Sequence, residues 1–360
     1  MIPVKQYLLF IFITLALFFT GNVYAQEKAY PKNGEGITLF LQRFHRTGST
    51  YQKEFLELNK GKFGKNNSLL RHVKYTLPPL HTEKKKQSQT TVAQGKKKTA
   101  SKSTANKASS SRNRKNNTEP LFGKSLAKYT VNSSILKGAT FYLVSGHGGP
   151  DPGAIGTMGK HKLHEDEYAY DIMLRLARNL LMRGANVEII IQDAKDGIRD
   201  QQFLNNSKRE TCMGNTIPLN QVKRLQQRCT KINTLSKKNK STYKRAIFIH
   251  VDSRSKNKRT DVFFYHQNNN KYSKRLAKNM KSTFANKYKR HQPGRGFSGT
   301  VAGRNLYVLR HTIPTSVFVE LGNIQNHYDQ QRIILSNNRQ ALANWLCEGF
   351  VKDYHYYKKN

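Results

Sequence analysis

Short apolar runs and helical patterns alternate along the second half of the chain. The runs are rich in β-branched and aromatic residues, as buried strands are, and they cover residues 140–144, 187–192, 246–249, 261–265 and 316–319. Apolar positions with helical spacing predict helices over residues 165–183, 220–235, 271–288 and 338–353. This alternation predicts an α/β fold in which a twisted, mostly parallel sheet carries helices on both faces.

The first of these helices has the most regular pattern. Its first turn is acidic at Glu165, Asp166 and Glu167, and Gly184 follows its last turn. Acidic side chains stabilise a helix N-terminus and glycine is a common stop, so both ends are well defined. Residues 194–218 match neither a strand nor a helix pattern, and we expect them to form an irregular surface insertion.

The first 25 residues have the layout of a secretory signal peptide. Lys5 precedes an apolar run over residues 8–20, and the segment ends at the small residue Ala25. A retained membrane anchor is the alternative, but a run of about 13 residues is short for a bilayer. We therefore expect cleavage after Ala25, export to the periplasm, cell envelope or extracellular space, and no membrane span in the mature protein.

Two different segments separate the signal from the α/β region. Residues 26–80 contain enough apolar positions for a small module, whereas residues 81–136 form a basic, low-complexity linker. Within it, residues 82–118 carry lysine triplets at 84–86 and 96–98 that are spaced by small polar residues. Residues 82–118 therefore cannot offset their ordering entropy and are predicted to be disordered. The role of the linker is either a solubilising tether or an electrostatic tether to anionic envelope polymers.

The chain is strongly basic, with 63 Lys and Arg against 22 Asp and Glu and a formal net charge of +41. Such a balance indicates a polyanionic neighbour. Export argues against nucleic acid and favours envelope polymers. The three cysteines, Cys212, Cys229 and Cys347, leave two possibilities open: a Cys212–Cys229 disulfide, or buried free thiols.

Four ionisable residues stand at predicted strand ends or helix starts. His147 and His250 follow apolar strands, Glu165 opens the first helix, and Glu320 ends the last strand. Two histidines and a carboxylate are one standard ligand set of a catalytic zinc, and they leave a fourth position for water. A second carboxylate beside that water would serve as general base. Taken singly, a histidine at a strand end more often has a structural role, and an acidic residue at a helix start is ordinary, whereas a glutamate that ends an apolar strand, as Glu320 does, has few structural uses.

The four positions lie within longer motifs, namely Gly146-His-Gly-Gly-Pro-Asp-Pro-Gly-Ala-Ile-Gly156, Glu165, Ile249-His-Val-Asp-Ser253 and Val319-Glu-Leu-Gly322. Over residues 137–355 the chain resembles the zinc-dependent N-acetylmuramoyl-L-alanine amidases of the amidase_3 class. The resemblance implies Zn²⁺ bound by His147, Glu165 and His250, with Glu320 as the catalytic carboxylate. It also implies peptidoglycan as partner and hydrolysis of the amide between N-acetylmuramic acid and L-alanine by zinc-activated water.

Some assignments stay open within this resemblance. His164 and Glu167 flank Glu165 and could replace it as a ligand. Arg304 and Arg310 precede the strand of Glu320 and could hold carboxylates of the stem peptide. The alternative function is a non-catalytic exported protein that binds the cell wall or another polyanion.

The N-terminal module carries its own resemblance. Gly34-Glu-Gly-Ile37 leads into a helical pattern, Phe55-Leu-Glu-Leu-Asn59 follows, and Tyr75-Thr-Leu-Pro-Pro79 closes the segment. The order resembles a diverged LysM peptidoglycan-binding module, and an unspecialised helical cap is the alternative.

Overall fold

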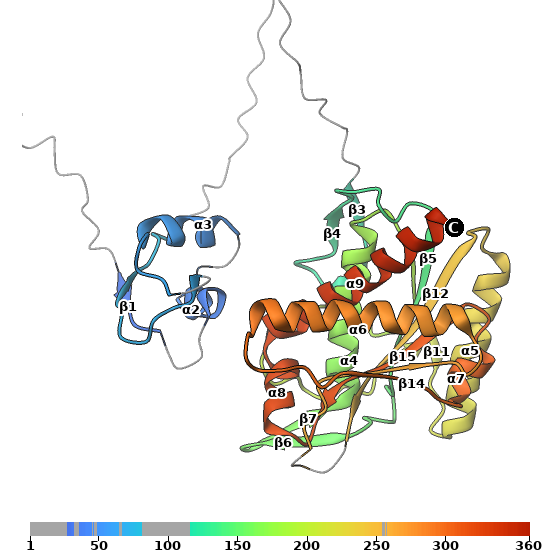
Figure 1. Ribbon diagram of the computed structural model, residues 1–360. Coiled ribbons are helices and arrows are strands. Elements are labelled where there is room, and N and C mark those ends of the chain that lie inside the picture. Colours follow the sequence, from blue (N-terminus) through green and yellow to red (C-terminus); the bar gives the residue numbers. More distant parts are fainter. Residues whose placement is uncertain are drawn as a thin grey trace, which may run out of the picture. The chain divides into compact units, whose positions relative to one another are not determined.

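The computed structural model describes residues 27–31, 36–44, 46, 49–64, 67–80, 116–253, 256 and 258–360. The chain divides into two compact units, Met1–Asn106 and Lys107–Asn360 (Figure 1). The predicted signal peptide and residues 81–115 of the predicted linker lie outside the described residues. No helix in the described part of the chain is both long and apolar enough to cross a membrane.

The N-terminal unit is a strand–helix–helix–strand module. It consists of β1 (Lys28–Ala29), α2 (Ile37–Arg43), α3 (Ser49–Leu58) and β2 (Tyr75–Thr76), and β1 pairs antiparallel with β2. Phe40, Phe55 and Tyr75 form a fully buried aromatic core. Asn59, at the end of the Leu-Asn motif, accepts a hydrogen bond from the Thr76 N–H at 2.8 Å and donates to the Thr76 carbonyl at 2.8 Å. This buried amide joins the end of α3 to the closing strand.

The second unit is built on a six-stranded sheet of order β14-β13-β15-β12-β5-β8. The strands are β5 (Ala139–Ser145), β8 (Asn186–Ile189), β12 (Tyr243–Asp252), β13 (Phe263–His266), β14 (Thr300–Gly303) and β15 (Thr315–Asn323). The four neighbouring strands β8, β5, β12 and β15 run parallel to one another. Strand β13 runs antiparallel to β15, and β14 is parallel to β13. The mostly parallel sheet predicted from the sequence is confirmed.

Helices cover both faces of this sheet, as predicted. One face packs against α4 (Glu165–Leu181), α6 (Lys271–His291) and α9 (Ser336–Lys359), and Figure 1 shows α6 and α9 in front of it. The other face packs against α5 (Gln221–Lys238) and α7 (Tyr307–His311). Strand β5 contributes to both layers: Phe141 and Leu143 point to the first core, Tyr142 and Val144 to the second. A strand buried on both faces explains its unbroken apolar sequence.

The linker predicted over residues 81–136 ends earlier than expected. Residues 116–136 belong to the second unit and form β3 (Asn116–Thr118), the 3-10 turn η2 (Pro120–Phe122) and β4 (Lys128–Thr130). The side chains of Phe122 and Leu136 are fully buried in the main core. Each belongs to a two-residue apolar pair, Leu121-Phe122 or Ile135-Leu136, that stands among polar residues, so the sequence gives no periodic signal for them.

Two further expectations are corrected by the structure. Residues 194–218 are not wholly irregular, since they include β10 (Thr211–Cys212) and β11 (Asn215–Thr216), which extend from β9 (Ile191–Gln192). The possible Cys212–Cys229 disulfide is wrong. Both residues are free thiols in the apolar layer beneath α5, and burial raises the pKa of each. Cys347 is likewise free and buried, and burial raises its pKa to about 12.

Candidate active site

The loop after β5 holds His147 in an unusual backbone conformation. Its φ of 55° lies in the left-handed region, which costs energy for a residue other than glycine. Neighbouring groups fix the loop: the guanidinium of Arg228 donates to the His147 carbonyl, and the Gly149 N–H donates to the Glu210 carboxylate at 2.9 Å. The imidazole is therefore presented by a strained but well-anchored turn.

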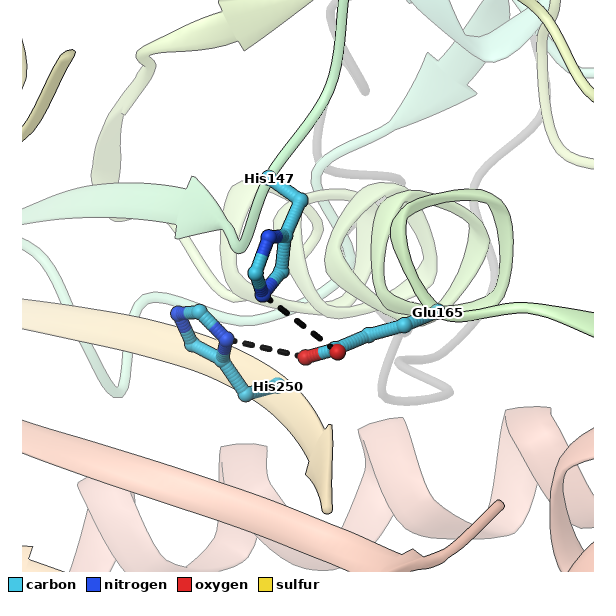
Figure 2. Close-up of side chains that lie close together, drawn as sticks. All are labelled: His147, Glu165 and His250. Atoms are coloured by element: carbon cyan, nitrogen blue, oxygen red, sulfur yellow. Dashed lines mark hydrogen bonds and ion pairs between the residues drawn. The ribbon is translucent and has the colours of Figure 1, made fainter. Parts of the chain in front are cut away.

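Three of the residues predicted as ligands meet at the carboxyl ends of β5 and β12. The Glu165 carboxylate lies between the two imidazoles, with Oε2 at 3.3 Å from His147 Nε2 and Oε1 at 2.9 Å from His250 Nδ1 (Figure 2). One potential ligand atom from each residue lies within 4.8 Å of the others. Glu165 is 4% exposed and also accepts from the backbone N–H groups of Ala154 and Val251. The group can hold a metal ion.

The two alternative ligands to Glu165 lie outside this group. Glu167 is buried and pairs with Arg199 at 2.8 Å, and it accepts a hydrogen bond from the Ser207 N–H. His164, the last residue of β7 (His161–His164), is not among the residues whose ligand atoms converge. The first residue of α4 is thus the one that the fold directs at the two histidines.

Two glycines make room for these side chains. A Cβ atom on Gly146 would lie 2.3 Å from Cε1 of His250, far inside contact distance. Gly153 has a φ of 69°, and a Cβ there would lie 2.7 Å from both Glu165 Oε2 and His147 Cδ2. These two glycines of the motif are therefore required by the close approach of His147, Glu165 and His250.

The charges of the site are strongly coupled. Burial alone would lower the pKa of His147, but hydrogen bonds to Asp151 and Glu165 and their charges raise it to about 10. Burial would raise the pKa of Glu165, yet hydrogen bonds from the two histidines hold it well below its ordinary value. Burial lowers the pKa of His250. Without a metal, the carboxylate and the His147 imidazolium therefore neutralise each other.

Residues 142–352 match the model of the Amidase_3 family, described as N-acetylmuramoyl-L-alanine amidase. The chain belongs to this family. Its members are peptidoglycan hydrolases, and the second unit is accordingly an amidase domain. No curated protein sequence matches the chain.

Several solved structures resemble this domain at low sequence identity. Cwp6 from Clostridium difficile is 19% identical, with a TM-score of 0.44, over 59% of this chain and 28% of its own. The catalytic domain of the amidase CwlV from Bacillus (Paenibacillus) polymyxa var. colistinus is 20% identical, with a TM-score of 0.43, over 59% and 97%. The amidase AmiC2 of Nostoc punctiforme is 19% identical, with a TM-score of 0.44, over 61% and 99%.

The amidase domain surrounds His147 with residues that sequence reasoning did not single out. Asp151 Oδ2 lies 2.6 Å from His147 Nδ1, and Arg224 forms an ion pair with the same carboxylate. Burial would raise the pKa of Asp151, but His147, the Gly153 N–H and Arg224 lower it to about 2. Asp151 could have been found from its place in the glycine-rich motif, four residues after the histidine.

Arg224 and Arg228 of α5 also line a cavity of about 260 Å³ beside the candidate metal group. Its other walls include His147, His250, Tyr307 and Phe318. Burial and the nearby Arg224 charge lower the pKa of Arg228 to about 10, which still leaves it cationic at neutral pH. Their four-residue spacing on a predicted helix was the available sequence signal.

Glu320 lies on the strand next to His250. The two Cα atoms are register partners in the parallel pair of β12 and β15, so their side chains share one face of the sheet. Phe318, two residues earlier on that face, stacks on the His250 ring with centroids 4.3 Å apart. Glu320 is partly buried. This position borders the metal group without belonging to the three-residue cluster.

Arg304 and Arg310 are not among the residues that line the cavity. Both are exposed, and the Arg304 guanidinium lies 4.8 Å from the Tyr265 ring centroid. Within the described cavity wall, Arg224 and Arg228 supply the positive charge instead.

Proposed function

We propose that the chain is an exported amidase that uses zinc to hydrolyse the bond between N-acetylmuramic acid and the L-alanine of the stem peptide. Its ligands are His147, Glu165 and His250, and Glu320 is the general base. The convergence of two imidazoles and one carboxylate in a buried group, all within 4.8 Å, carries this proposal.

The donor set fits zinc. Two histidine nitrogens and one carboxylate oxygen are the protein ligands of many hydrolytic zinc sites, which leave one position for water or substrate. A bound zinc ion would lower the pKa of a water molecule and polarise the amide carbonyl. Metal binding would require His147 to lose the proton that it shares with its carboxylate neighbours, because only the neutral ring can act as a ligand.

The surrounding residues supply orientation and charge. Asp151 accepts the hydrogen of His147 Nδ1, so in the neutral ring the Nε2 lone pair would be free for a metal ion held next to Glu165. Phe318 holds the His250 ring by stacking. Arg224 and Arg228 give the cavity a positive wall that suits carboxylates of the stem peptide, a role that Arg304 and Arg310 could supplement outside the cavity.

Glu320 moves the proton in this scheme. Its carboxylate takes a proton from the water that attacks the lactyl carbonyl and returns it to the nitrogen of the departing alanine. The C–N bond breaks, and the products are a carboxylate on the sugar and a free amine on the peptide. General acid–base catalysis of this kind contributes about 10²–10⁴-fold to the rate.

Substitution of Glu320 tests its role as general base. Glu320→Gln should lower kcat for a soluble muramoyl peptide by at least about 100-fold while the zinc content of the purified protein stays unchanged. Glu348→Gln is a matched control, because Glu348 lies on α9 with a side chain 41% exposed and pairs with Lys287. Full activity of the Glu320 variant would refute the assigned role.

We also propose a wall-binding role for the parts outside the amidase domain. The strand–helix–helix–strand unit with its buried Asn59 supports a LysM-like module. Residues 81–115 hold the lysine triplets and suit anionic envelope polymers. The signal-like segment 1–25 supports export to the periplasm, envelope or extracellular space, where peptidoglycan is accessible.

A further inference from the structure

A second pocket lies at the amino ends of the parallel strands, and the candidate metal group lies at their carboxyl ends. It has a volume of about 570 Å³ and opens between the starts of β12, β15 and α6 and the last turns of α9. Tyr243, which begins β12, stands seven residues before His250 on the same strand. At about 3.3 Å per residue the two sites are roughly 23 Å apart, so the pocket is distinct from the active site.

The walls of this pocket combine cations with aromatic rings. Arg245, Lys271 and Arg275 line it together with Tyr272 and Tyr356. The two tyrosines are 48% and 49% exposed, respectively. The Arg275 guanidinium lies 4.3 Å from the Tyr356 ring centroid and 5.5 Å from that of Tyr272. A ligand in this pocket therefore meets flat apolar faces and positive charge at the same place.

A buried carboxylate fixes the two arginines. Asp353 is fully buried, and its oxygens accept from Nε of Arg245 and Nε of Arg275, each at 2.8 Å. The Tyr243 hydroxyl donates to the same carboxylate at 2.9 Å. Asp353 is one carboxylate shared by two arginines, and Lys271 also lines the pocket, so the lining keeps a positive charge. The two guanidinium groups are held in place before any ligand arrives.

We propose that this pocket binds a carboxylated amino sugar, namely an N-acetylmuramic acid unit whose stem peptide has been removed. The proposal rests on the proposed function, because amide hydrolysis turns a neutral amide on the sugar into a lactyl carboxylate. A planar guanidinium binds a carboxylate through two parallel hydrogen bonds, and tyrosine faces pack on the C–H faces of a pyranose ring. A sugar that still carries its peptide lacks that charge.

The consequence is a product-recognition site remote from catalysis. The pocket holds sugar units that have already lost their peptide. The enzyme therefore stays on the same glycan strand while its active site reaches the next amide. The chain creates this ligand by its own reaction, and the number of such units rises as cleavage proceeds.

The test measures binding of free N-acetylmuramic acid to the full-length, metal-loaded protein by titration calorimetry, with N-acetylglucosamine, which lacks the carboxylate, as the comparison sugar. We expect N-acetylmuramic acid to bind at least 10-fold more tightly. Tyr356→Ala should remove this binding component, and Arg275→Gln should weaken it at least 10-fold. Tyr328→Ala, at a tyrosine 68% exposed on α8 (His327–Ile334), should leave it unchanged. Because the active site also accepts product, only the component lost in Tyr356→Ala belongs to the pocket.

Several results would overturn the proposal. Equal affinity for the two sugars, or binding unaffected by Tyr356→Ala, excludes recognition of the carboxylated sugar here. If inorganic phosphate competes with N-acetylmuramic acid for the pocket at similar concentrations, the pocket is an unspecific anion site. This result also overturns the proposal. Hydrolysis of a soluble muramoyl peptide is measured on the same variants and should remain at the wild-type rate. A wild-type protein that does not hydrolyse this peptide contradicts the proposed function. A wild-type protein that hydrolyses it but does not bind the sugar contradicts only the proposal for the pocket.

Discussion

Asp151 is the residue that orients His147, the first of the proposed metal ligands. Its carboxylate contacts His147 Nδ1 at 2.6 Å and is itself held by Arg224 and by the Gly153 N–H. A carboxylate behind a histidine ligand selects the tautomer and raises the basicity of the coordinating nitrogen. The orientation of His147 is thus set by a residue of its own loop, four positions along the chain, as the proposed metal binding requires.

Asp151→Asn should therefore lower zinc affinity about 10–100-fold, as measured by competition with a chromophoric chelator. Since Asp151 also raises the pKa of His147, wild-type protein should release a proton from this ring on binding zinc at neutral pH, and the variant should release less. Asp200→Asn, at a side chain 79% exposed, is the control. Unchanged affinity together with unchanged proton release contradicts the orienting role.

At the scale of elements, strands β5 and β12 approach so closely at their ends that a glycine is required between their ligands. The Gly146 N–H donates to the Ile249 carbonyl at 2.7 Å, and His250 is confined on its other side by Phe318. Gly146 does not have a positive φ, so alanine introduces no backbone strain at this position. A substitution there tests side-chain crowding by itself.

Gly146→Ala should displace the His250 ring and reduce zinc content and hydrolysis at least 10-fold, whereas the far-ultraviolet circular dichroism spectrum remains that of the wild type. A Cβ atom 2.3 Å from Cε1 cannot be accommodated unless the ring moves. Gly36→Ala, where a Cβ meets no atom within 4 Å, is the matched control. A fully metallated and active Gly146 variant is the result that contradicts this explanation.

The elements show what sequence can and cannot predict. The buried central strands were identifiable because apolar runs report burial on both faces, and their ends indicated where His147 and His250 would meet. Strand β14 and helix α7 lack such runs, since β14 is the exposed edge of the sheet and α7 is only five residues long. Arg224 and Arg228 were missed as site residues because their roles depend on how α5 packs over the loop of His147, which local pattern does not encode.

At the scale of the whole molecule, the two ends of the parallel strands carry differently built sites. At their carboxyl ends Glu165 lies between two histidines, and arginines of α5 line the neighbouring cavity, whereas at their amino ends Arg245 and Arg275 share the single buried carboxylate of Asp353. Helix α6, which contributes to the pocket, contains no acidic residue among its 21. The high net charge is thus partly organised into a specific surface of the amidase domain.

The boundary between the units can be tested with two truncations. Removing residues 1–115 leaves β3, η2 and β4 in place, so hydrolysis of a soluble muramoyl peptide should continue at the wild-type rate. Binding to insoluble peptidoglycan should fall, because the LysM-like unit and the lysine triplets are lost.

Removing residues 1–136 also deletes Phe122 and Leu136, which are fully buried in the main core. Loss of a large buried side chain costs about 3–5 kcal/mol, so this shorter protein should unfold at much lower urea concentration. Equal stability of the two truncations would place the domain start at residue 137 after all, and unchanged sedimentation with peptidoglycan would remove the binding role from the N-terminal part.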